Sequence, residues 1–170
     1  MNKNFLSKLR KIKLLVLDVD GVLTDNSVYI GSDGNEFKGF NIQDGFGIHL
    51  LQQEAKVKVA LLSGRYSKAT DIRAKELDIE MVYNGYTDKA QVLEEIKLKT
   101  ALDCSEMAYV GDDFADIPVL RKTGVAIAVK NARPEVKKVC QYVTENSGGN
   151  GAVREVIDLI LKAKHIKLEY

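Results

Sequence analysis

The strongest constraint on the fold is a repeated alternation of short apolar segments, rich in Val, Ile and Leu, with longer segments of helical pattern. We predict strands at residues 12–17, 57–62, 81–83, 108–110, 125–129 and 142–143. Helices are expected at 46–55, 67–77, 88–100, 114–122, 134–139 and 151–164. This alternation predicts a three-layer, Rossmann-like α/β fold, in which helices cover both faces of a parallel sheet.

Two β-prone segments follow the first strand, and no helical segment separates them. Residues 28–30 and 36–41 flank the turn sequence Gly31-Ser32-Asp33-Gly34. Turn residues between two such segments predict a β-hairpin, here spanning about residues 27–41. The 170 residues are otherwise the length of one ordinary domain, so we expect a single domain over residues 1–170.

The composition of the chain excludes several classes of binding partner. The chain has 25 Lys and Arg against 24 Asp and Glu, a net charge of +1, which provides no overall basic field for nucleic acid. Its apolar segments are far shorter than the ~20 residues that span a membrane. Two cysteines, Cys104 and Cys140, lack metal-binding spacing and read as packing residues, and His49 and His165 show no partner pattern. We expect a cytoplasmic protein that acts on a small molecule and binds neither nucleic acid nor membrane.

Polar residues stand where four of the predicted strands end. In parallel sheets, ligands bind at the carboxyl ends of the strands, so these clusters mark the expected site. They are Asp18-Val19-Asp20, Ser63-Gly64-Arg65, Asn84-Gly85 and Gly111-Asp112-Asp113. On its own, the sequence Asp-Val-Asp-Gly is equally consistent with a simple turn at the end of a strand and with a functional site. Together with the second acidic pair it predicts a Mg²⁺ site, because several carboxylates without a nearby histidine are hard oxygen ligands.

Candidate groups for binding an anion occur in the same order along the chain. The Ser63 hydroxyl and the Gly64 backbone precede a helix, an arrangement suited to phosphate oxygens. Lys89 opens the next helix, where its ammonium could reach the same edge of the sheet. Singly, Ser63 reads as a helix cap and Lys89 as a surface lysine. Their order after successive strands favours a shared phosphate site.

These motifs resemble those of a known superfamily. DVDGVLT, the LLSG strand end, a lysine at a helix start and GDDFAD are similar to the four motifs of the haloacid dehalogenase phosphohydrolases. Over nearly the whole chain, DVDGVLTD, FNIQDGFGI, LLSGR, YVGDDFADIPV and GGNGAVREV resemble the family of phosphatases for 3-deoxy-D-manno-octulosonate 8-phosphate (Kdo 8-phosphate). The resemblance implies Mg²⁺-dependent hydrolysis to Kdo and phosphate in lipopolysaccharide biosynthesis.

The resemblance also implies roles for single residues. Asp18 would be the nucleophile that forms an aspartyl-phosphate, and Asp20 the general acid and then base. Mg²⁺ would be held by Asp18, the Asp20 backbone carbonyl and Asp112, and Lys89 would help to shield the charge of nucleophile and phosphate. The remaining implied residues are Ser63 and Gly64 on the phosphoryl group and Asp113 and Asp116 around the metal ligands.

Substrate recognition is implied for Asp20 as well and for a further set of residues, Asn41, Ile42, Gln43, Asp44, Gly45, Arg65 and Arg73. Arg65 and Arg73 are cations suited to a sugar carboxylate, although Arg73 also reads as a solvated helix residue. Gln43 departs from the basic residue often found in the family's version of this segment. Residues 147–151 read equally as a flexible loop and as a loop near the site.

Insertion lengths imply how the site is completed. Many members of the superfamily carry a cap domain between the first and third motifs, but here Asp20 to Ser63 leaves room only for the hairpin and a helix. Ser63 to Lys89 leaves room for a helix and a short strand. A site without a cap is open to water, and the resemblance implies a homotetramer built through the hairpin.

Three other functions stay open from the sequence. The same chemistry could serve a nine-carbon sugar acid 9-phosphate, although Arg65 stands where that relative typically has an acidic residue. A phosphoacceptor signalling module also uses aspartate, metal, hydroxyl and lysine, but its acidic pair is arranged differently. A non-catalytic relative is disfavoured by the complete set of Asp18, Asp20, Lys89 and Asp112.

Overall fold

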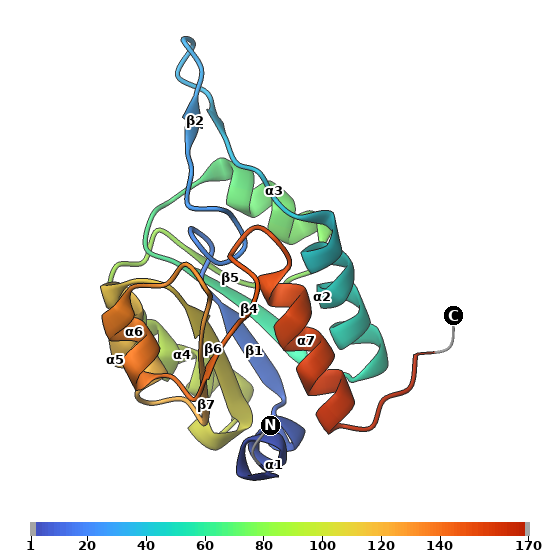
Figure 1. Cartoon of the computed structure of the whole chain (residues 1–170). Coiled ribbons are helices and arrows are strands. Elements are labelled where there is room, and N and C mark those ends of the chain that lie inside the picture. Colours follow the sequence, from blue (N-terminus) through green and yellow to red (C-terminus); the bar gives the residue numbers. More distant parts are fainter. Residues whose placement is uncertain (1–2, 169–170) are drawn as a thin grey trace.

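A single six-stranded parallel sheet organises the protein in our computed structural model, which describes residues 3–168 (Figure 1). The strand order is β5-β4-β1-β6-β7-β8. The bounds are β1 (Leu14–Leu17), β4 (Lys58–Ser63), β5 (Met81–Asn84), β6 (Met107–Gly111), β7 (Val125–Ala128) and β8 (Tyr142–Val143). The predicted α/β class with a parallel sheet is confirmed.

Helices cover both faces of this sheet. One face carries α1 (Lys3–Lys11), α2 (Ile42–Glu54), α3 (Lys68–Glu76) and α7 (Ala152–Ala163), with α2 and α7 side by side in Figure 1. The other carries α4 (Lys89–Thr100), α5 (Ile117–Leu120) and α6 (Pro134–Val139). Right-handed crossovers explain the division, because the connections through α2 and α3 step in one direction along the sheet and those through α4 and α5 in the other.

The core lies at the centre of the sheet. All four residues of β1 and all four of β7 are buried, as expected of strands with neighbours on both edges and helices on both faces. Helix α1 was not predicted from the sequence. It is held by two buried side chains, Phe5 and Leu9, and the Phe5 ring stacks on Tyr142 with centroids 5.5 Å apart. Within residues 3–168, no helix is both long and apolar enough to cross a membrane.

The predicted hairpin exists but is shorter than expected. Strands β2 (Tyr29–Ile30) and β3 (Glu36–Phe37) pair antiparallel in a separate small sheet that projects from the body (Figure 1). The chain from residue 38 to residue 41, predicted as strand, instead returns to the body. The hairpin arm, defined here as residues 36–40, therefore connects the projecting turn with the main sheet.

Two helix boundaries differ from the prediction. Helix α2 begins at Ile42 and not at residue 46, because the Asn41 side chain accepts hydrogen bonds from the Gln43 and Asp44 backbone N–H groups at 2.7 and 3.2 Å. Residues 114–122 form two pieces, the 3₁₀ turn η2 (Phe114–Asp116) and then α5. A second 3₁₀ turn, η1 (Cys104–Glu106), precedes β6.

Candidate active site

Strand register brings the predicted polar clusters to one edge. Leu17, the last residue of β1, lies opposite Leu61 of β4 and Val110 of β6. Asp18 therefore emerges between the ends of its two neighbours, where Ser63 and Asp112 stand. The connections leave β1 and β6 toward opposite edges of the sheet at this point, which is where open α/β sheets bind ligands.

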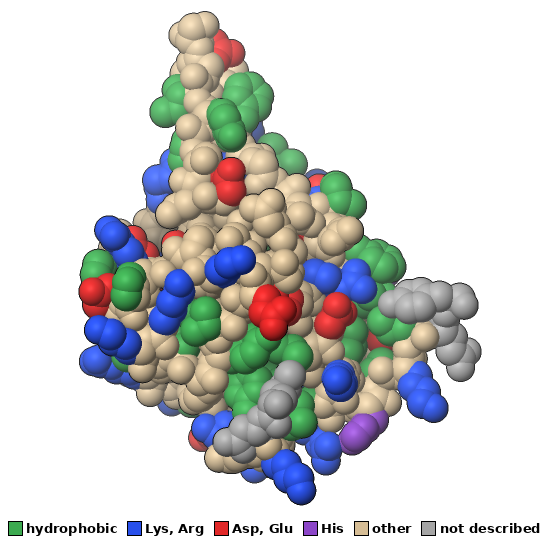
Figure 2. Space-filling view, in the orientation of Figure 1, with side chains coloured by type: hydrophobic (Ala, Val, Ile, Leu, Met, Phe, Trp, Pro, Cys, Tyr) green, Lys and Arg blue, Asp and Glu red, His purple; other side chains and the backbone are tan. Residues whose placement is uncertain are grey.

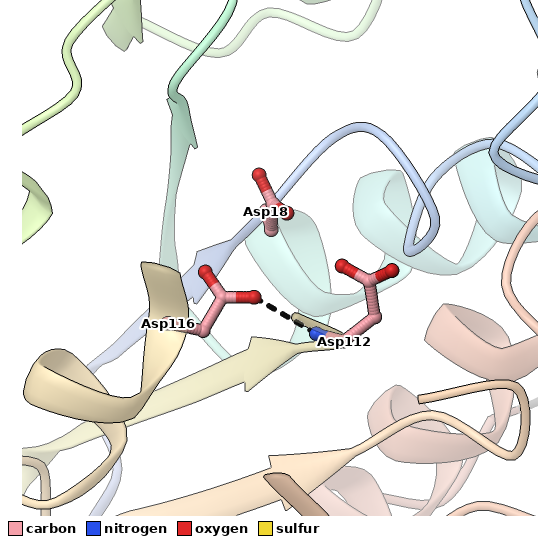
Figure 3. Close-up of side chains that lie close together, drawn as sticks. All are labelled: Asp18, Asp112 and Asp116. Carbon is pink, nitrogen blue, oxygen red and sulfur yellow. Dashed lines mark hydrogen bonds between the residues drawn. The ribbon is translucent and has the colours of Figure 1, made fainter. Parts of the chain in front are cut away.

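Three buried carboxylates converge here. Asp18, Asp112 and Asp116 each place one oxygen within 4.8 Å of the others (Figure 3). The Lys89 ammonium lies 2.8 Å from Asp18 Oδ1 and 2.7 Å from Asp116 Oδ1, and its side chain is only 4% exposed. When all three carboxylates are ionised, the one ammonium leaves two negative charges unbalanced in a buried place. A divalent cation is the matching complement, so the residues fit a hard metal ion.

The electrostatics of the cluster agree with this fit. Burial, together with the charge of Asp116, raises the pKa of the Asp18 carboxyl well above its ordinary value. Burial and the charges of Asp116 and Asp113 raise the pKa of Asp112 to about 7. Burial alone would lower the pKa of Lys89, but the Asp18 and Asp116 carboxylates outweigh it and raise that pKa. The acids are thus destabilised as anions, and the ammonium is stabilised as a cation.

Asp116 is the most constrained member of the cluster. Its Oδ1 accepts hydrogen bonds from Lys89 and from the Tyr109 hydroxyl, at 2.7 and 2.6 Å. Its Oδ2 accepts from the backbone N–H groups of Asp112 and Asp113, at 2.9 and 3.1 Å (Figure 3). With both oxygens occupied, Asp116 orients the other groups. The carboxylates of Asp18 and Asp112 are the ones left to hold a metal.

The loop that follows β1, residues 18–24, passes close to Asp112 and depends on Gly21. This residue has φ +87°, and a Cβ there would overlap the Asp112 carboxylate. A second loop covers it, since Asn131 donates to the Gly21 carbonyl at 3.1 Å and Gly149 N–H donates to Val22 O at 3.0 Å. A Cβ on Gly148 would in turn overlap the Gly21 carbonyl. The loop at residues 147–151 therefore packs directly on the Asp18–Thr24 loop.

The predicted phosphate-binding residues also lie together. Ser63 is buried, and its hydroxyl donates to the Arg65 carbonyl at 2.8 Å. A Cβ built on Gly64 would stand 3.8 Å from Lys89 Cε, so the Gly64 backbone lies beside the lysine that contacts Asp18. The Gly64 backbone and the Lys89 ammonium thus lie beside each other at the end of β4, the strand next to β1.

Asp20 makes its contacts with the hairpin arm. Its Oδ1 is 2.7 Å from Lys38 Nζ, and its Oδ2 is 3.7 Å from Arg65 Nε. Arg65 also forms two hydrogen bonds with Glu36, one of them 3.0 Å long between Nη2 and Oε1, and Ser67 donates to Glu36 at 2.7 Å. Hydrogen bonds from Arg65 and Ser67 lower the pKa of Glu36 to about 2.

Several residues predicted to recognise substrate have structural contacts. Asn41 caps α2, and buried Asp44 accepts from the Arg154 and Gly151 backbone N–H groups at 2.7 and 3.3 Å, which caps α7. Buried Arg73 donates to the Asn41 carbonyl at 3.3 Å. The other members of the predicted set have different surroundings: Gly45 leaves space for the Arg73 guanidinium, and exposed Ile42 and Gln43 line an open depression with Tyr29 and Phe40.

Comparison with known proteins places this site in a family. A family model described as haloacid dehalogenase-like hydrolase matches residues 52–157. Kdo 8-phosphate phosphatase KdsC of Escherichia coli K12 is 40% identical over 164 residues, covering 96% of this chain and 87% of the relative. The chain belongs to the haloacid dehalogenase-like hydrolases.

Solved structures of such hydrolases share the whole fold. A Kdo 8-phosphate phosphatase from Moraxella catarrhalis, in complex with magnesium, phosphate and Kdo, superposes with a TM-score of 0.93 at 41% identity, covering 96% of this chain and 94% of that one. The Yersinia pestis enzyme gives a TM-score of 0.95 at 39% identity, with 97% and 89% covered. A cobalt-bound Haemophilus influenzae enzyme gives 0.89 at 36% identity, with 93% and 92% covered.

Sequence reasoning missed four contributors to this haloacid dehalogenase-like site. Tyr109 lies within a strand and reads as core, and Glu36 and Lys38 lie in what reads as a hairpin strand. No pattern marks their partners, which come from other segments. Asn131 was detectable, because it follows the end of β7 and the strand-end argument applies there as well.

Proposed function

We propose that this protein is a Mg²⁺-dependent phosphatase that hydrolyses Kdo 8-phosphate to Kdo and inorganic phosphate. The observation that carries the proposal is Asp18, a strand-end carboxylate 2.8 Å from the buried Lys89 ammonium, in a cluster with two excess negative charges. Relatives about 40% identical over nearly the whole chain carry this activity in their names, which supports the sugar-acid substrate.

The reaction follows from the placed groups. Asp18 attacks phosphorus, the bond from phosphorus to the sugar oxygen breaks, and Asp20 gives a proton to that oxygen. Water then attacks the aspartyl-phosphate while Asp20 takes a proton from it, which releases phosphate and restores Asp18. Lys89, Ser63 and the Gly64 backbone hold the transferring group throughout. Electrostatic positioning of this kind is the main contribution in phosphoryl transfer.

The carboxylates of Asp18 and Asp112, with the Asp20 backbone carbonyl, would hold the Mg²⁺ ion. When bound, it supplies positive charge that reduces repulsion between the Asp18 carboxylate and the phosphate dianion. Asp116 keeps Asp112 and Lys89 in position through its four hydrogen bonds. Arg65 is the cation proposed to meet the sugar carboxylate, and it reaches the site from the end of β4.

We also propose a cytoplasmic homotetramer assembled through the hairpin. The projecting hairpin, residues 27–41, carries apolar side chains, seen in green below its tan and red tip in Figure 2. The exposed members are Val28, Tyr29, Ile30 and Phe37, between 40% and 75% exposed. An exposed apolar edge of this kind supports association with further copies of the chain. Cys104 and Cys140 are both unpaired, in keeping with a reducing compartment.

A phosphate-release assay tests the function. Purified protein is given Kdo 8-phosphate, a nine-carbon sugar acid 9-phosphate and glucose 6-phosphate as a sugar phosphate without a carboxylate. We expect release from Kdo 8-phosphate to exceed the other two, to stop in EDTA and to return with Mg²⁺. Full activity in excess EDTA, or preference for the nine-carbon substrate, would contradict the proposal.

A further inference from the structure

We infer that Lys38, in the hairpin arm, is a positioning residue for the Asp20 carboxylate. The inference rests on the proposed function, in which Asp20 exchanges the proton of the leaving oxygen. Lys38 Nζ lies 2.7 Å from Asp20 Oδ1, across 18 positions of sequence that include the whole projecting turn. The arm therefore reaches back to the reacting edge of the sheet within one chain.

The burial of this pair is what distinguishes it from a surface salt bridge. The Lys38 side chain is 0% exposed, although its backbone is partly exposed, and the Asp20 side chain is 23% exposed. Both joined atoms are shielded from solvent, and among the described residues neither has a hydrogen-bond partner, so the contact between them is an ion pair. A covered ammonium has lost its hydration and requires a nearby anion, whereas exposed pairs contribute little. Its other carboxylate neighbour, Glu36 Oε1, is farther away at 3.9 Å.

The contact leaves the two oxygens of Asp20 in different situations. Oδ1 faces Lys38, while Oδ2 is 3.7 Å from Arg65 Nε, beyond hydrogen-bond distance. Holding Oδ1 fixes the rotation of the carboxyl group and leaves Oδ2 as the oxygen that exchanges the proton. The proton moves from Oδ2 to the sugar oxygen as its bond to phosphorus breaks, and a proton from water returns to Oδ2 in the second step.

The arm itself is anchored, so Lys38 does not move freely. Glu36 accepts hydrogen bonds from the side chains of Arg65 and Ser67, which follow β4. These contacts join the arm to the segment that also supplies Ser63. A hydrolase without a cap domain thus gains, from its own hairpin arm, a fixed support for the proton-transferring acid.

The test compares two substrates that differ in their need for a proton. Kdo 8-phosphate releases an alkoxide that must be protonated, and 2,4-dinitrophenyl phosphate releases a stable anion that needs no proton. The variants are Lys38→Met, Lys38→Arg and, as matched control, Lys68→Met. Lys68 is an exposed lysine that lines a surface groove together with Lys38 and Phe37. The readout is kcat/KM, which covers the steps through cleavage of the phosphorus–oxygen bond.

We expect Lys38→Met to lose ~10- to 100-fold in kcat/KM on Kdo 8-phosphate, the scale of a misplaced reacting group. Its loss on the dinitrophenyl ester should be under ~3-fold, because general acid catalysis is not needed there. Lys38→Arg should recover most of the lost activity, since it returns the cation. Lys68→Met should match wild type on both substrates, and circular dichroism melting should show that every variant is folded.

Other outcomes overturn the inference. Equal losses on both substrates would assign Lys38 a purely structural role, and a rise in KM with unchanged kcat would make it a substrate contact. An unchanged Lys38→Met would show that Asp20 needs no such support. The Asp20→Asn variant distinguishes failure of the Lys38 inference from failure of the proposed function. If it shows the leaving-group dependence and Lys38→Met does not, only the inference fails; if wild type hydrolyses neither ester, the proposed function fails and the inference falls with it.

Discussion

At the scale of single residues, the two aspartates after β1 have different surroundings despite being two positions apart. Asp18 is buried against Lys89, whereas Asp20 lies partly exposed at the base of the hairpin arm. Residues two positions apart lie on the same side of an extended peptide, and the turn at Gly21 follows directly after Asp20, so both acids stay at the same edge of the sheet. Their different surroundings suit one residue to attack and the other to proton transfer.

The first prediction separates these two roles by substitution. Asp18→Asn removes the nucleophile, so turnover should be lost and no phosphorylated protein should accumulate. Asp20→Asn keeps the nucleophile and should lose ~10²–10⁴ in kcat on Kdo 8-phosphate, the usual contribution of general acid–base catalysis. Acid-quenched single turnovers with ³²P-labelled substrate measure both quantities. Asp78→Asn, at a helix end away from the site, serves as control, and an active Asp18→Asn would favour direct attack by water.

A second prediction concerns pH and the Glu36–Arg65 pair. Because Arg65 and Ser67 lower the pKa of Glu36 to about 2, its carboxylate stays ionised in the folded protein well below the ordinary value of 4.5. The pair's stabilisation is therefore complete above pH 4.5 and is lost as the pH falls through about 2. In Arg65→Met the titration midpoint of Glu36 should rise toward 4.5, as followed by ¹³C NMR of the carboxyl group. An unchanged midpoint would mean that Arg65 does not hold the arm.

At the scale of elements, sequence pattern predicts what depends on neighbours in the chain. Strands such as β1 and β7 were predictable because burial on both faces leaves continuous apolar segments. Helix α1 was not, because the elements that it packs on, α7 and the Tyr142 ring of β8, lie far along the chain. The start of α2 moved to Ile42 because one side chain, Asn41, caps it. Local pattern thus predicts elements well and their ends less well.

The same distinction holds for the site. Its acids and lysine were predictable because each stands at a strand end or a helix start, positions that the sheet gathers automatically. The pairing of Lys38 with Asp20 was not, since it depends on how a hairpin arm folds back over the sheet edge. The contacts that occupy Arg73 and Asp44 likewise arise from packing of α2 against α3 and α7.

The third prediction tests the hairpin as an assembly element. Ile30→Asp places a charge on a side chain that is 75% exposed on β2. If the proposed tetramer forms through the hairpin, this variant should be shifted toward monomer, because a buried unpaired charge is costly at an interface. Leu98→Asp, a comparably exposed position on α4, should leave assembly unchanged. Sedimentation velocity measures the oligomeric state of both variants, and an unchanged Ile30→Asp protein would show that the hairpin is not the assembly surface.

Activity of the Ile30→Asp variant distinguishes assembly from chemistry. If a neighbouring subunit completes the sugar-reading surface, turnover of Kdo 8-phosphate should fall while that of an aryl phosphate falls less, since Asp18, Asp20, Lys89 and Asp112 all belong to one chain. A monomer with undiminished sugar-phosphate turnover would show that specificity is built within the chain. Because Ile30 lies opposite Glu36 in the β2–β3 pair, the uncharged variant Ile30→Ser is assayed beside Ile30→Asp, so that repulsion of Glu36 is not mistaken for loss of assembly.

At the scale of the whole molecule, the active site is a local cost to folding. The buried cluster of Asp18, Asp112 and Asp116 carries more negative charge than Lys89 balances, and burial raises the pKa values of the first two. Folding the metal-free protein therefore brings like charges together in a place of low polarity. The large apolar core around β1, β6 and β7 offsets this cost, which links stability to the metal.

The last prediction follows from that link. Mg²⁺ should bind the folded cluster and not the unfolded chain, so it should raise the melting temperature above that in EDTA. The free energy of unfolding should rise by ~2.7 kcal/mol when Mg²⁺ is at 100 times its Kd. Asp112→Asn removes one charge from the cluster and also a metal ligand. It should melt at a higher temperature than wild type in EDTA and gain little from Mg²⁺. Asp158→Asn, an exposed acid on α7, should gain as much from Mg²⁺ as wild type. Differential scanning calorimetry of the three proteins, with and without Mg²⁺, measures both effects at once. An Asp112→Asn protein that is less stable than wild type in EDTA, or that keeps the full Mg²⁺ shift, would show that Asp112 is neither a source of the repulsion nor a ligand.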